Sequence, residues 1–311
     1  MSRYILKRMM LTLPLLLLIS FLTFILTHLT KEDPAVVILH AQEVPNVTPE
    51  LIKENRAQYG LDKPFLMQYW DWLWSILHLD WGTSYVTHEE ISSRLGPAFI
   101  NTLKLTLVSS IVVIVCSIIL GTLTALCQNT WFDRFARSAS FIVTAMPLYW
   151  LASILIIYIS VKMNLLPTSG LLGWTSYILP AGTIALAYTG IYFRNVRSAM
   201  IQQMSEEYIL YARAMGVPYW RIVLSAMRNA MQVVVSIFCM SIPLILGSSV
   251  IIENVFAWPG MGQLSVKAVL NQDFPMIQAY VLIVSCLFVI FNTLSDIINL
   301  LMNPRLRGEL Q

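Results

Sequence analysis

Charged residues are scarce in this chain of 311 residues. They make up 12% of it, against about 25% in an average soluble protein. Hydrophobic residues make up 57%, and the mean hydropathy is +0.68. This composition excludes an ordinary soluble domain and predicts an integral membrane protein. The net charge of +3 is small and requires no nucleic-acid partner.

The common catalytic and metal-binding patterns are also missing from the sequence. No Gly-x-x-x-x-Gly-Lys-Ser/Thr segment occurs, so the chain cannot build a P-loop. The four histidines lack metal-ligand spacing. An intramembrane protease would need a Ser with a His, or two Asp residues, at membrane depth, and neither pair is found. We therefore predict no catalytic residue, no metal site and no cofactor bound by this chain.

Cysteine gives no information on the redox compartment. All four cysteines lie in or at the ends of apolar runs, without a Cys-x-x-Cys pair: Cys116, Cys127, Cys239 and Cys286. They are typical of small apolar packing residues.

The sequence is rich in long apolar runs, each near or above the roughly 17 to 25 residues that cross a bilayer. The runs are 9–29, 99–126, 139–161, 177–193, 231–252 and 276–301. They predict an all-α protein with six transmembrane helices. The first run is about twice as long as the apolar part of a signal peptide, so we expect it to remain in the mature protein.

Lys and Arg residues indicate the orientation, since cationic short loops stay in the cytoplasm. They gather before the first run, between the second and third, between the fourth and fifth, and after the sixth. Segment 31–98 instead carries ten carboxylates against five Lys or Arg. Both termini are therefore predicted to be cytoplasmic, and segment 31–98 external.

The expected organisation follows from this topology. It comprises an N-terminal membrane helix (1–30), an external helical segment (31–98), a five-helix core (99–301) that includes a cytoplasmic loop (194–230), and a cytoplasmic tail (302–311). In the external segment, Thr48 and Pro49 predict a helix start. Apolar residues at helical spacing over 65–79 predict a second, amphipathic helix.

The cytoplasmic loop contains a predicted short helix from Glu206 to Gly216. Ser205 is expected to cap its first turn, and Gly216 suits the left-handed position after its last turn. Eleven residues span roughly 16 Å, which is too short to cross a bilayer. The small residues Ala212, Ala214 and Gly216 predict a shallow surface for docking a partner. The alternative is an interfacial amphipathic helix without a partner.

Several motifs carry a family resemblance. Tyr208, the stretch Tyr211-Ala212-Arg213-Ala214-Met215-Gly216 and the later Arg228-Asn229-Ala230 resemble the "EAA" loop of ABC importer permeases of the dipeptide, oligopeptide and nickel type. Further similar segments are Tyr59-Gly60-Leu61-Asp62-Lys63-Pro64, Phe256-Ala257-Trp258-Pro259-Gly260-Met261-Gly262 and Asn303-Pro304-Arg305. The family often has Pro shortly after Arg-Asn-Ala, and here Met231-Gln232-Val233 stands there.

The resemblance implies a type I ABC importer permease fold in a bacterial cytoplasmic membrane, forming half of a pathway for short peptides, nickel or a metal chelate. It implies a second homologous permease (a heterodimer), two ATPase subunits that bind ATP and Mg, an external substrate-binding protein and surrounding lipid as partners. The residues it assigns to an ATPase-coupling helix are Glu206, Glu207, Tyr208, Tyr211, Ala212, Arg213, Ala214 and Gly216. A gradient-driven secondary transporter is the alternative function.

Prolines and an outer turn mark possible pathway or gating positions. Pro147 and Pro243 each remove a backbone donor from a predicted membrane helix, which favours a bend there, although ordinary packing kinks are the alternative. Trp258, Pro259 and Gly260 form the outer turn after the fifth run.

Overall fold

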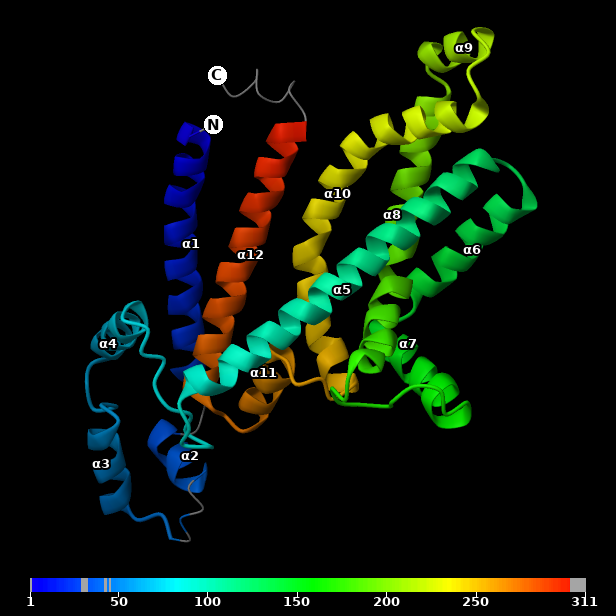
Figure 1. Cartoon of the computed structure of the whole chain (residues 1–311). Helices are drawn as coiled ribbons and strands as arrows, with labels where there is room; N and C mark the ends of the chain where they lie inside the picture. The colour runs from blue at the N-terminus through cyan, green and yellow to red at the C-terminus, as the bar shows by residue number, and fades with distance from the viewer. Residues whose placement is uncertain (1, 29–32, 42–43, 45, 303–311) are drawn as a thin grey trace. The chain divides into compact units, whose positions relative to one another are not determined.

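The computed structural model describes residues 2–28, 33–41, 44 and 46–302 (Figure 1). Within these ranges the regular elements are helices, as the sequence predicts. They are α1 Ser2–His28, α2 Pro34–Ala41, α3 Pro49–Gln58, α4 Phe65–Leu77, α5 Ile91–Leu126, α6 Trp131–Ala145, α7 Leu148–Leu155, the π-helix η1 Ile156–Lys162, the 3-10 helix η2 Trp174–Tyr177, α8 Ile178–Met204, α9 Glu207–Ala214, α10 Tyr219–Val255, α11 Met261–Leu270 and α12 Phe274–Met302.

Three of the described helices are long and apolar enough to cross a membrane: Ile91–Leu126, Val234–Val255 and Phe274–Ile298. A fourth candidate is the pair Trp131–Ala145 and Leu148–Lys162. Helix α1 contributes a shorter apolar stretch, Thr12–Ile25. The count of six spans therefore remains a prediction.

Pro147 breaks the predicted third span. Helix α6 ends at Ala145, α7 begins at Leu148, and the two parts are bent by 105°. The bend expected at Pro147 is confirmed, because the proline ring cannot continue the hydrogen-bonded ladder. Pro243, by contrast, lies at a buried position inside the uninterrupted helix α10.

The first of two compact units comprises residues 1–101 and 260–289. Within this unit helix α3 begins as predicted, since the Thr48 hydroxyl accepts a hydrogen bond from the Leu51 N–H and Pro49 is the first residue of the helix. Aromatic rings then join α4 to α1: the ring of Tyr69 lies 5.1 Å from that of Phe21 and 5.5 Å from that of Phe24. The predicted apolar face of α4 thus packs on the first helix of the chain.

The second unit comprises residues 102–259 and 290–311, and helix α8 lies at its centre against α6, α7 and α10. Two glycines permit close helix packing. A Cβ atom at Gly190 would lie 2.4 Å from Thr144 Oγ1, and one at Gly121 would lie 2.5 Å from Val196 Cβ. Both approaches are too close for any larger residue, so these glycines set the spacing of α8 against α6 and α5.

Candidate functional site

Helix α9 is the predicted docking helix, and its first turn differs from the expectation. The helix begins at Glu207, with Glu206 at the N-cap position and no side-chain cap. Ser205 instead ends α8, and its hydroxyl donates to the Gln202 carbonyl over 2.8 Å. The predicted cap at Ser205 is therefore wrong, because α8 extends to Met204 and holds Ser205 in a helical conformation.

The end of α9 agrees with the sequence. Gly216 has a φ angle of +73°, the left-handed conformation that glycine adopts without strain. Its N–H donates to the Arg213 carbonyl, and the Val217 N–H donates to the Ala212 carbonyl, both over 3.0 Å. This pair of bonds is a Schellman motif, which closes the helix and directs the chain into α10.

The inner face of α9 fixes the helix on the ends of α8 and α10. Ile209 is only 2% exposed and belongs to the hydrophobic core, and Ala212 is half-buried against the same core. The Tyr208 hydroxyl donates to Gln203 Oε1 and accepts from Asn229 Nδ2, both over 3.1 Å. These contacts join α9 to a residue of α8 and one of α10, so its orientation is defined by the fold.

The outer face of α9 carries large apolar side chains in the open. Leu210 is 72% exposed, Tyr211 68% and Met215 67%, with Ala214 exposed between them. We call these four residues the docking surface. Figure 1 shows α9 beyond the ends of α8 and α10. Contiguous exposed apolar residues of this kind are typical of a protein contact site.

The predicted docking residues are therefore divided between the two faces. Tyr211, Ala214 and the exposed Gly216 are open to a partner, and Arg213 and Glu207 are exposed beside them. Ala212 faces the chain's own core. The shallow surface expected from Ala212, Ala214 and Gly216 together is thus formed without Ala212, since the eight-residue helix presents that position inward.

A buried ion cluster joins the start of α6 to α8, and it was not predicted from the sequence. Asp133 is fully buried at the start of α6 and accepts two hydrogen bonds of 2.8 Å from Arg197 on α8. Arg137 lies 3.3 Å from the same carboxylate, and the Asn129 N–H donates to it. In the sequence, Arg137 and Arg197 had been used only to predict which loops lie in the cytoplasm. A carboxylate with arginines close to it in the sequence indicates an ion pair, but no local pattern identifies Arg197 as the partner of Asp133.

The predicted pathway residues have different surroundings. Trp258 is fully buried, with its ring 4.6 Å from that of Tyr177, so it packs in the core of the second unit. Pro259 is exposed, and Gly260 is the N-cap of α11. Glu253, which was not predicted as a site residue, is a fully buried carboxylate that accepts a 2.7 Å hydrogen bond from the Thr102 hydroxyl.

Comparison with known proteins places this geometry in a family. Residues 117–308 match the family described as binding-protein-dependent transport system inner membrane component, and residues 1–108 match its N-terminal domain. The metal-staphylopine import system permease protein CntB of Staphylococcus aureus (strain NCTC 8325 / PS 47) is 59% identical over 307 residues, 99% of each chain.

More distant relatives cover the chain as fully. A putative peptide transport system permease protein of Brucella abortus (strain 2308) is 34% identical over 99% of this chain and 100% of its own. The glutathione transport system permease protein GsiC of Salmonella typhimurium is 35% identical over 99% of each chain. These matches set aside the gradient-driven transporter. The chain belongs to the binding-protein-dependent transport system inner membrane components, and it is a permease subunit of an ABC importer for a peptide or a metal chelate.

Proposed function

We propose that the cargo of this permease is a metal chelate. The support is the 59% identity over nearly the whole length to a permease named for metal-staphylopine import, against 34% and 35% for the peptide and glutathione permeases. The chemistry is consistent with this cargo. A chelated metal keeps its ligands during transport, so the pathway need not supply the fixed oxygen or nitrogen ligands that a bare ion requires.

The docking surface supports the proposed assembly. Two such permeases, which we propose to be different chains, would form the pathway with two ATPase subunits inside and a substrate-binding protein outside. Helix α9 would be the coupling helix, with Tyr211, Ala214 and Met215 in a cleft of an ATPase subunit that binds ATP and Mg. The exposed apolar side chains of α9 are the observation that carries this proposal, and cytoplasmic termini would place α9 on the ATPase side.

Uptake assays test the cargo. In a strain that lacks this chain, uptake of a radioactive nickel–staphylopine complex should fall to background and return when the wild-type chain is restored. Uptake of dialanine and of free nickel should stay unchanged, because neither would be delivered by the receptor of this importer. If dialanine uptake falls instead, while the nickel complex enters normally, the metal-chelate proposal is wrong and the chain serves a peptide importer.

A further inference from the structure

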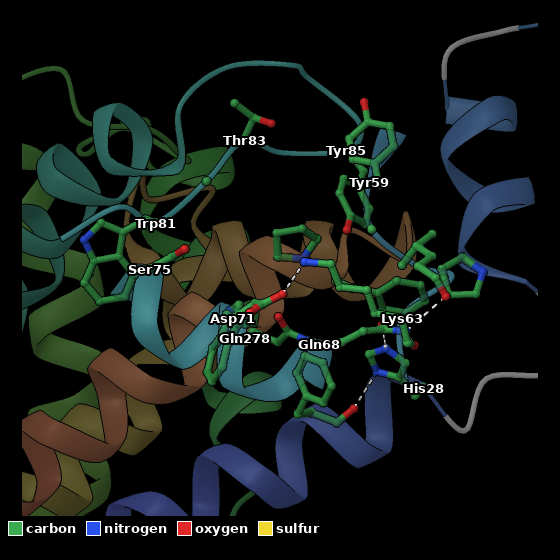
Figure 2. A pocket seen from close by; sticks show the side chains of 18 of the residues that line it. His28, Tyr59, Lys63, Gln68, Asp71, Ser75, Trp81, Thr83, Tyr85 and Gln278 are labelled. Carbon is green, nitrogen blue, oxygen red and sulfur yellow. Dashed lines mark hydrogen bonds and ion pairs between the residues drawn. The ribbon is translucent and has the colours of Figure 1, made fainter. Parts of the chain in front are cut away.

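A pocket of about 470 Å³ lies within the first unit, which does not include α9 (Figure 2). Its wall comes from the end of α1, the α3–α4 connection, α4, the loop after α4 and the start of α12. This volume falls in the range of small-molecule sites, about 300 to 1,000 Å³. Its walls combine aromatic rings with side chains of both charge signs, which is the pattern of a ligand site rather than of a packing gap.

Lys63 and Asp71 form an ion pair at this pocket, drawn as a dashed line in Figure 2. Their side chains are 52% and 47% exposed. An ion pair this open to water contributes little to stability, so a ligand can separate the two groups at small cost. A ligand with both a carboxylate and an ammonium group would give each residue a new ionic partner. Its carboxylate would bind Lys63, and its ammonium group would bind Asp71.

His28 lies in the wall of the pocket, where two contacts hold its ring. Its Nδ1 lies 2.8 Å from the Phe24 carbonyl, and its Nε2 lies 3.1 Å from Gln68 Oε1. The orientation of the Gln68 amide is fixed, because its Nε2 donates to the carbonyls of Leu61 and Lys63. Both ring nitrogens thus lie within hydrogen-bond distance of an oxygen atom, so the position of the His28 ring in the pocket wall is fixed.

The rest of the pocket wall consists of aromatic side chains whose positions are fixed by contacts within the first unit. The rings of Tyr59 and Tyr85 meet edge to face at 5.4 Å, and Figure 2 shows them side by side. Burial, together with the nearby Asp273 carboxylate, raises the pKa of Tyr85 to about 12, so its hydroxyl stays neutral. The Tyr85 N–H donates to Asp273, which anchors this loop to the residue before α12. Trp72 and Trp81 also line the pocket.

We propose that this pocket binds a small zwitterion with an aromatic side chain, such as an aromatic amino acid or dipeptide, between Lys63 and Asp71. The tyrosine and tryptophan rings would take the ligand's side chain, and the separated ion pair would take its two charges. The inference depends neither on the metal-chelate cargo nor on docking by α9. Direct binding therefore tests it separately from transport.

The test is equilibrium dialysis of radiolabelled glycyl-L-tyrosine against the full-length chain, purified in lipid nanodiscs with its associated subunits. We expect saturable binding, and at least tenfold weaker binding of the blocked analogue N-acetyl-glycyl-L-tyrosine amide, since each lost charged contact is worth about tenfold in affinity. Lys63→Met and Asp71→Asn should each weaken glycyl-L-tyrosine binding by a similar factor.

The matched control is Arg94→Gln, which removes the exposed ion pair of Arg94 with Glu89 outside the pocket. It should bind the dipeptide as the wild type does. The absence of saturable binding, equal binding of the blocked analogue, or unchanged binding by both pocket variants would each overturn the proposal. If a pocket variant fails to fold, the comparison of the free and blocked dipeptides on the wild-type chain still decides the outcome.

Discussion

Replacing Gly216 with valine should abolish association with the ATPase subunit and uptake while leaving the chain in the membrane. The φ angle of +73° is the physical reason, since a β-branched residue in the left-handed region costs on the order of 1 to 2 kcal/mol. A Cβ atom there meets nothing within 4 Å, so the effect comes from the backbone and not from a collision inside the chain. Loss of the Schellman motif would reorient the docking surface. Co-purification with the ATPase subunit and uptake of the proposed cargo, the nickel–staphylopine complex, measure the result.

The matched control is Gly216→Asn, because asparagine tolerates the left-handed conformation better than valine. It should retain ATPase association and most of the uptake. If the valine variant assembles and transports as well as the asparagine variant at equal abundance, the end of α9 does not determine docking.

Substitution of Asp133 with alanine should destabilise the chain by about 3 kcal/mol. The carboxylate is fully buried, and its loss would leave the guanidinium of Arg197, 17% exposed, without its bidentate acceptor. An unpaired charge in such a site is costlier than the pair itself. The midpoint of thermal unfolding in detergent should fall clearly, and less protein should accumulate in the membrane.

Two comparisons make this prediction specific. The double variant Asp133→Leu/Arg197→Met should recover most of the lost stability, because it removes both charges together. The variant Glu89→Ala breaks an ion pair whose side chains are 40% and 56% exposed and should cost less than about 1 kcal/mol. An Asp133→Ala chain that unfolds at the same temperature as Glu89→Ala would show that the buried cluster has no stabilising role.

Local signals explain what the sequence predicted well. Thr48 and Pro49 mark the start of α3, Pro147 breaks the ladder between α6 and α7, and Gly216 ends α9. In each case the residue acts through its own backbone or its nearest neighbours. Such effects need no knowledge of which helices pack together, so they are visible in the sequence alone.

The errors arose where tertiary packing decides. Ser205 has the chemistry of a helix cap, but the length of α8 gives it to the preceding helix. Ala212 suits a docking surface, but the way α9 lies on the core turns it inward. The bidentate contact between Asp133 and Arg197 joins residues 64 positions apart, and no local pattern reveals it.

Site-specific photo-crosslinking tests the docking of α9 most directly. A benzoylphenylalanine at Tyr211, 68% exposed on the docking surface, should crosslink to the ATPase subunit in the assembled transporter. The control carries the same group at Trp174, which is 77% exposed and lies just before the first residue of α8. The length of α8, roughly 40 Å, separates this position from α9. The control should give no crosslink to that subunit. An active transporter in which Tyr211 gives no crosslink to the ATPase subunit, or in which both positions give the same one, would contradict docking through α9.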